Sequence, residues 1–115
     1  MQTIEGKRQA LTDGMMGVLD RAQLGMPRRD QEQFVAGFVD LAVHAANGNL
    51  GPRDEYLDVI IPAVRASRMP LGDVMAGMVS VAMGGAIALE GADRDWWIRF
   101  TTEYTTNFCA RWEKA

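Results

Sequence analysis

His44 is the only histidine of the chain, and so the only side chain suited both to ligate haem iron and to act as a base near neutral pH. It follows Leu41, Ala42 and Val43 near the end of an expected helix, where a protonated imidazole would interact favourably with the helix dipole. That structural role needs no ligand, and no partner motif accompanies the histidine. We therefore favour the structural role. The alternative is that the chain is a globin-like protein that binds a small ligand, haem or another tetrapyrrole through His44.

The remaining reactive side chains give catalysis no starting point. One cysteine, Cys109, and one histidine cannot form a zinc quartet, and a single cysteine cannot form an intramolecular disulfide. We find no nucleophile with a base, no phosphate-binding glycine loop and no metal-ligand spacing. We expect no enzyme, no metal and no cofactor. The lone cysteine and the acids among the first 20 residues, which argue against a secretory signal, favour a cytoplasmic protein.

Methionine is abundant, with eight residues, and its flexible side chain suits adaptable apolar cavities. Met75, Met78 and Met83 could line a pocket for a small apolar ligand together with His44. The same residues could equally fill gaps in a core, and we favour core packing because any apolar helix supplies such a cluster.

Size and charge limit the class of protein. A chain of 115 residues with 48% apolar and 23% charged residues can bury one core, so residues 1–115 are expected to form a single domain. The net charge of −3, from 12 Lys and Arg against 15 Asp and Glu, gives no electrostatic reason to bind nucleic acid or anionic lipid.

These residues must be positioned by helices, because apolar residues recur at spacings of three and four throughout the chain. Glycine and proline punctuate the pattern, and Pro62 inside the third helix predicts a kink or a split. No run of alternating apolar and polar residues is long enough to favour a β-strand over a helix. The sequence predicts an all-α bundle of about five helices, at approximately residues 3–24, 28–45, 53–67, 70–90 and 94–114.

The fourth of these helices has no charged residue between Val74 and Leu89. Those 16 residues would extend only about 24 Å as a helix, which is short for a hydrocarbon core of about 30 Å, so we expect no membrane span. An all-apolar helix is buried, either at the centre of the bundle or partly against a second subunit. Small residues recur every four positions and predict a close helix crossing at Ala76, Ser80, Gly84 and Ala88.

The last helix carries a stripe of aromatic residues that covers more than one face, since Trp96 and Trp97 lie about 100° apart. Outward-facing aromatic residues would mark a partner interface, and homodimers are the commonest oligomers. Alternatively, neighbouring helices cover the whole stripe. The candidates for a dimer interface are Trp96, Trp97, Phe100, Tyr104, Phe108 and Trp112.

The segment EYLDVIIPAVRASRMPLGDVMAGMVSVAMGGAIALEG resembles the N-terminal sensor domains of RsbR-type proteins of the bacterial stressosome. The likeness covers about residues 30–112, with Arg65, Met69, Pro70 and Leu71 matching the turn between two helices. It implies a globin-like helical fold that lacks haem and forms dimers. The last helix would then match the one that leads into a regulatory output domain.

Together, these observations favour a non-catalytic, cytoplasmic module of bacterial signalling. We expect a globin-like homodimer that works as a sensor or as a protein-interaction domain with a signalling protein as its partner. A small ligand or that partner would act by changing helix packing at the dimer interface.

Overall fold

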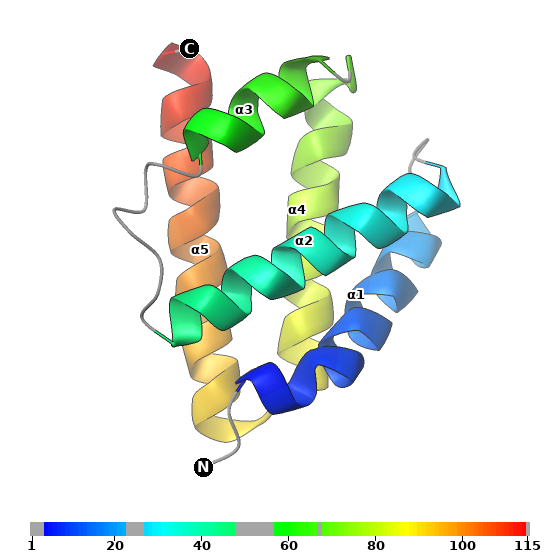
Figure 1. Cartoon of the computed structure of the whole chain (residues 1–115), viewed down its shortest axis with the longest axis vertical. Helices are drawn as coiled ribbons and strands as arrows, with labels where there is room; N and C mark the ends of the chain where they lie inside the picture. Colours follow the sequence, from blue (N-terminus) through cyan, green and yellow to red (C-terminus); the bar gives the residue numbers. More distant parts are fainter. Residues whose placement is uncertain (1–3, 23–26, 48–56, 67, 115) are drawn as a thin grey trace.

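The computed structural model describes residues 4–22, 27–47, 57–66 and 68–114, and every element in these ranges is helical (Figure 1). The all-α prediction is confirmed, with five α-helices in the described part of the chain. The elements are a 3₁₀ turn η1 (Ile4–Lys7), α1 (Arg8–Ala22), α2 (Arg28–Ala46), α3 (Leu57–Ala66), α4 (Leu71–Ala88) and α5 (Gly91–Lys114).

Prolines shape the helix boundaries. Pro27 and Pro70 stand directly before α2 and α4, where a missing N–H costs nothing, and the Pro70 carbonyl accepts from Asp73 N at 3.0 Å. Pro62 lies inside α3, which continues through it as one α-helix, so the predicted split does not occur. Residues 53–56 of the predicted third helix lie outside the described residues.

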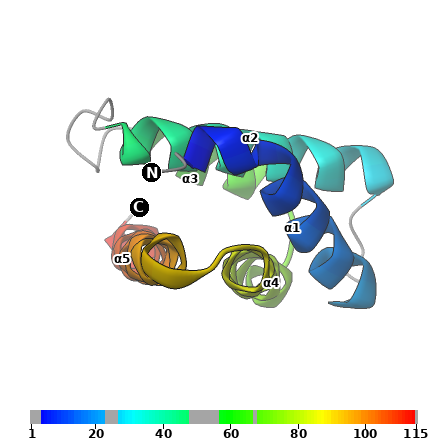
Figure 2. The same cartoon turned by 90° about the horizontal axis from the view of Figure 1, so that it is seen from below.

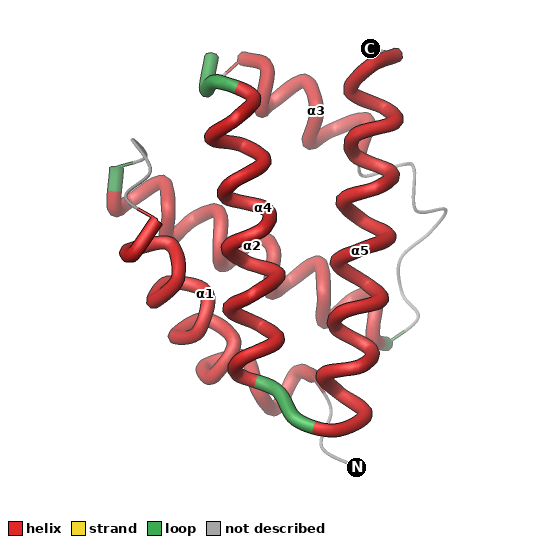
Figure 3. The backbone as a smooth tube through the Cα atoms, turned by 180° about the vertical axis from the view of Figure 1, so that it is seen from behind, coloured by secondary structure: helices red, strands yellow, loops and turns green. Residues whose placement is uncertain are grey.

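The helices form two layers. α4 and α5 lie side by side, α2 and α3 lie over one face of this pair, and α1 descends from that layer along the edge of α4 (Figure 2). Figure 3 shows the opposite face of α4 and α5, in front of which no described helix lies. The described helices therefore leave this one face of the pair uncovered.

The short connection between α4 and α5 makes them antiparallel neighbours. Buried Leu89 has extended backbone, and Gly91, the first residue of α5, has a φ of +56°, a left-handed conformation that glycine adopts without strain. Arg94 Nε donates to the Ala86 carbonyl at 2.8 Å and so ties the start of α5 to the end of α4.

Trp97 fixes the contact between α4 and α5. Its side chain is fully buried, and its indole Nε1 donates to the Ala82 carbonyl of α4 at 3.0 Å. The ring lies so close to Gly85 that a Cβ there would overlap it. A small residue in α4 therefore makes room for the largest side chain of the core.

Phe38 brings α2 onto the same part of α5. Its ring centroid lies 5.8 Å from Trp97, 6.1 Å from Phe100 and 5.3 Å from Tyr104, with edge-on or tilted geometry. Aromatic pairs favour these geometries and contribute beyond the burial of their area. An aromatic cluster within the core thus forms where α2 crosses α5.

The closest approach between two helices is that of α1 and α4. A Cβ added at Gly84 would lie 2.5 Å from Met15 Cα and 2.7 Å from the Gly14 carbonyl oxygen. A Cβ added at Gly14 would lie 2.5 Å from the Gly84 oxygen and 3.2 Å from the Ala88 Cβ. The backbones of α1 and α4 are in direct contact here, so neither glycine can be replaced by a residue with a Cβ without displacing a helix.

Two polar contacts tie the ends of the layers together. Lys7 Nζ donates to Asp93 Oδ2 at 2.7 Å, so Asp93, in the first turn of α5, anchors the N-terminal turn to that helix. Arg65 Nη2 donates to the Trp112 carbonyl at 2.7 Å, and its guanidinium lies 4.3 Å from the Trp112 ring centroid. α3 is held to the end of α5 by this second contact.

Substitution of Gly84 tests the crossing directly. Because the α1 backbone cannot give way as a flexible side chain would, we expect Gly84→Leu to lower the free energy of unfolding by about 3 kcal/mol or more, with a smaller loss for Gly84→Ala. The matched control is Gly17→Ala on the open side of α1, where an added Cβ would have no atom from outside its own helix turn within 4 Å. It should raise stability by about 0.5–1 kcal/mol through helix propensity alone. Urea unfolding followed by circular dichroism measures all three, and equal stability of wild type and Gly84→Leu would contradict the crossing.

Candidate functional site

The aromatic stripe of α5 belongs mainly to the core of the single chain. Trp97, Tyr104 and Phe108 are 0%, 6% and 1% exposed. As candidates for a dimer interface these three are wrong, because the other helices cover the inner side of α5 and leave their rings no access to a second chain. Their interpretation as core residues, which the sequence left open, is the one the structure supports.

The other three aromatic candidates are half-buried and have partners within the chain. Trp96 stacks on Phe100 with ring centroids 5.0 Å apart and an interplanar angle of 7°. Trp112 stacks on Phe108 at 5.6 Å and receives the Arg65 guanidinium on its ring. None of the three stands out as an isolated, solvent-facing aromatic residue.

Large apolar side chains are instead exposed on α4. Val79, Met83 and Ile87 follow each other at steps of four and are 51%, 53% and 65% exposed. Leu71, at 44%, starts the same series one turn before half-buried Met75, and Ile98 of α5 is 46% exposed. We call Val79, Met83 and Ile87 the α4 ridge. It lies on the side of α4 that faces away from the core.

A shallow groove of ≈ 540 Å³ lies beside the ridge, between α4 and α5. None of the described residues that line it is charged. Two of its four threonine hydroxyls are turned to their own helix, since Thr101 Oγ1 donates to the Trp97 carbonyl at 2.9 Å and Thr106 Oγ1 to the Thr102 carbonyl at 2.8 Å. The groove is lined by small and uncharged side chains, Val79, Ala82, Met83, Thr101, Thr102, Thr105, Thr106 and Cys109.

The ligand pocket suggested by the sequence does not form from its four residues. His44 is exposed in the last turn of α2, and Met83 is exposed on the ridge, whereas Met78 is buried on the inner side of α4. Met75 is half-buried, and its Sδ lies 3.9 Å from Cys109 Sγ of α5. An exposed His44 is also a poor haem ligand, because none of the described residues covers it to exclude water from the iron.

The row of small residues on α4 divides into two parts. Gly84 and Ala88 lie at the crossing with α1. Buried Ser80 donates through Oγ to the carbonyl of half-buried Ala76 at 2.7 Å, within α4 itself. The contact with Gly14 is thus made by Gly84 and Ala88.

By length and composition, α4 could also cross a membrane, and it is the one helix in the described ranges that could. Such a helix is weak evidence for a span, because the core helix of a soluble protein passes the same test. The inner side of α4 is buried against α1 and α5, so its apolar residues are already used in part for packing.

Comparison with known proteins finds no matching family model, no matching curated protein and no matching solved structure.

The ridge can be tested separately from any partner. Because Ile87 contributes little buried area to the single chain, we expect Ile87→Lys to change the free energy of unfolding by no more than about 0.5 kcal/mol. Val81→Lys places the same charge at a fully buried position of the same helix and should prevent folding. The measurement is urea unfolding at a concentration where light scattering shows single chains. A loss of about 2 kcal/mol or more for Ile87→Lys would show that the ridge is covered within the chain.

Proposed function

We propose that this chain is a non-catalytic, homodimeric sensor or interaction module, and that a second copy covers the ridge and groove of α4 and α5. The observation that carries the proposal is the exposure of Val79, Met83 and Ile87 in one row on the layer that no described helix covers (Figure 3). Contiguous exposed apolar surface of this kind typically marks an interface.

The shape of this face favours a second copy over an unrelated partner. A two-fold contact requires a surface that is complementary to itself, so that a feature of one copy meets a matching feature of the other. A ridge of large side chains lies directly beside a groove lined by alanine and threonine, and ridges of one helix pack into the grooves of another. The described groove lining is uncharged, so two copies would not repel each other there.

The signalling context rests on the resemblance to stressosome sensor domains. Under this proposal the helices take a globin-like arrangement without haem, and the protein acts in the bacterial cytoplasm on a signalling protein. The all-α architecture and the uncovered face of α4 and α5 support such a role.

The packing suggests how a signal would reach the interface. α4 carries the ridge on its outer side and makes backbone contact with α1 about 100° further around the helix, while Trp97 fixes it to α5. Close-packed helices move as rigid bodies rather than deform. A ligand or partner that displaces α1 or α5 would therefore shift the ridge and change the dimer.

Light scattering on a dilution series in detergent-free buffer tests the dimer. The wild-type chain should have twice the mass of 12.7 kDa, and Met83→Glu should give single chains, because a charge in the interface would be buried without a partner. Ala36→Glu, which adds the same charge at an exposed position of α2, should leave the dimer intact.

Two results would reject the proposal. A wild-type mass of 12.7 kDa at every concentration would remove the second copy. Solubility only in detergent would instead favour α4 as a membrane segment.

A further inference from the structure

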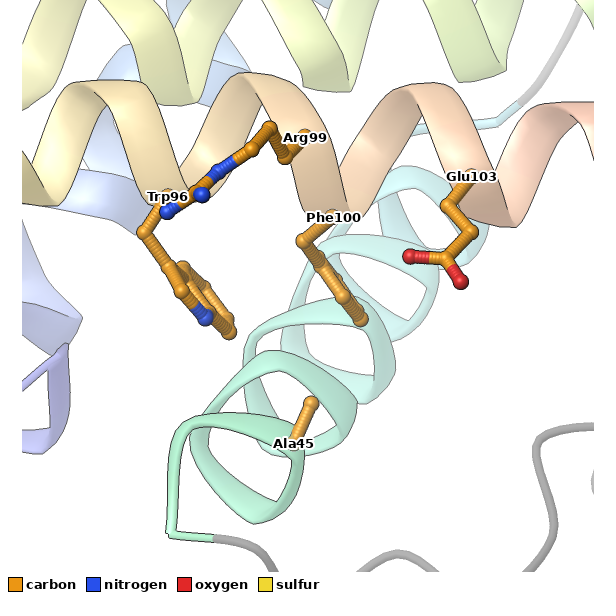
Figure 4. A pocket seen from close by; sticks show the side chains of 5 residues that line it. All are labelled: Ala45, Trp96, Arg99, Phe100 and Glu103. Carbon is orange, nitrogen blue, oxygen red and sulfur yellow. The ribbon is translucent and has the colours of Figure 1, made fainter.

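A second surface feature lies on α5, away from the proposed dimer face. A pocket of ≈ 320 Å³ opens where the end of α2 meets α5 (Figure 4). α5 contributes Trp96, Arg99, Phe100 and Glu103, at the spacing of one helix face, and Ala45 of α2 completes the lining. Trp96 and the groove residue Thr105 are nine residues apart and so point about 180° apart around the helix, which separates this pocket from the groove.

Two aromatic rings form the wall of the pocket. Trp96 and Phe100 stack nearly parallel, and the Phe100 centroid lies 6.1 Å from that of Phe38 in the core. The core therefore supports the wall from behind, although both rings stay partly exposed to solvent. A supported aromatic surface suits a planar apolar group, which can pack on ring faces or ring edges.

Hydrogen-bond donors lie at one end of this wall. Arg99 lies beside Trp96, and neither its guanidinium nor the Trp96 indole N–H has an acceptor among the described residues. The neighbouring Trp97 N–H and the Arg94 guanidinium, by contrast, both donate to backbone carbonyls of α4. The donors at this end of the pocket thus remain open to an anion.

The opposite end is acidic. Glu103 lies on the far side of Phe100 from Trp96, and Ala45 belongs to the last turn of α2, where the helix dipole is negative (Figure 4). The pocket therefore has hydrogen-bond donors at one end, a carboxylate at the other and two aromatic rings between them.

We propose that this pocket binds a planar aromatic carboxylate with a hydrogen-bond donor at its opposite end, an aminobenzoate being the simplest member of the class. Its carboxylate would accept from Arg99 and the Trp96 N–H, its ring would lie against Trp96 and Phe100, and its amino group would face Glu103. The volume is at the lower limit for small-molecule sites and fits a single ring. This site is independent of the second copy, and goes beyond the proposed interaction role.

The test is titration of the ¹⁵N-labelled full chain with 4-aminobenzoate. The three tryptophans give three indole N–H signals, and Trp96→Phe identifies that of Trp96. We expect the Trp96 signal to shift with a Kd on the order of 1 mM, and the fully buried Trp97 signal to stay in place. Benzoate and aniline, which each lack one of the two polar ends, should bind more weakly.

Arg99 provides the decisive variant. Loss of its charge should weaken binding about tenfold in Arg99→Gln, with partial recovery in Arg99→Lys. Arg29→Gln, an exposed arginine at the other end of α2, is the control and should bind as wild type does. Absence of a Trp96 shift up to ~10 mM ligand, or equal affinity of Arg99→Gln and wild type, would overturn the site. Light scattering on the same samples decides the dimer separately, so either proposal can fail without the other.

Discussion

The backbone crossing of α1 and α4 at Gly14 and Gly84 is the constraint on which the arrangement depends. Two helices can approach this closely only where both lack side chains, and the contact fixes which side of α4 faces inward. With that side set, Val81 and Met78 enter the core, and Met83 and Ile87 remain outside. The exposed ridge is thus a consequence of where the glycines lie.

The second determinant is the choice of large and small residues between α4 and α5. Gly85 admits the Trp97 indole, and Phe38 of α2 closes over the same ring. One tryptophan therefore contacts two helices besides its own, and its N–H bond to Ala82 sets the rotation of α5. This rotation leaves Trp96 and Phe100 at the border of the core, and Thr102 and Thr105 in the groove.

Much of the fold could be predicted from local sequence, whereas the faces of the helices could not. Apolar spacing and the prolines at positions 27 and 70 indicate where helices begin, because these signals act within one or two turns. In α4, however, apolar residues lie on every side, so periodicity cannot distinguish the exposed Ile87 from the buried Val81. Gly14 similarly looks like a weak position in a helix, and its role becomes visible only with Gly84 opposite.

The candidate sites show the same limit. Six aromatic residues on one helix predict an exposed interaction surface only if no other helix packs on them. Phe38 of α2, which is distant in sequence, packs on Trp97 and Tyr104 and so helps to bury them. The pocket at Arg99 likewise depends on where the end of α2 meets α5, which no local pattern encodes.

The two-residue connection between α4 and α5 affects the order in which the helices assemble during folding. Leu89 and Glu90 join neighbours whose contacts are close in sequence, so this hairpin can form with little loss of chain entropy. The Gly14 to Gly84 contact instead closes a loop that contains most of the protein. We therefore expect α4 and α5 to assemble early in folding and α1 to dock late, which leaves both sides of the hairpin uncovered in the intermediate stages. In such a chain, association between hairpins of two molecules could begin before either molecule has finished folding.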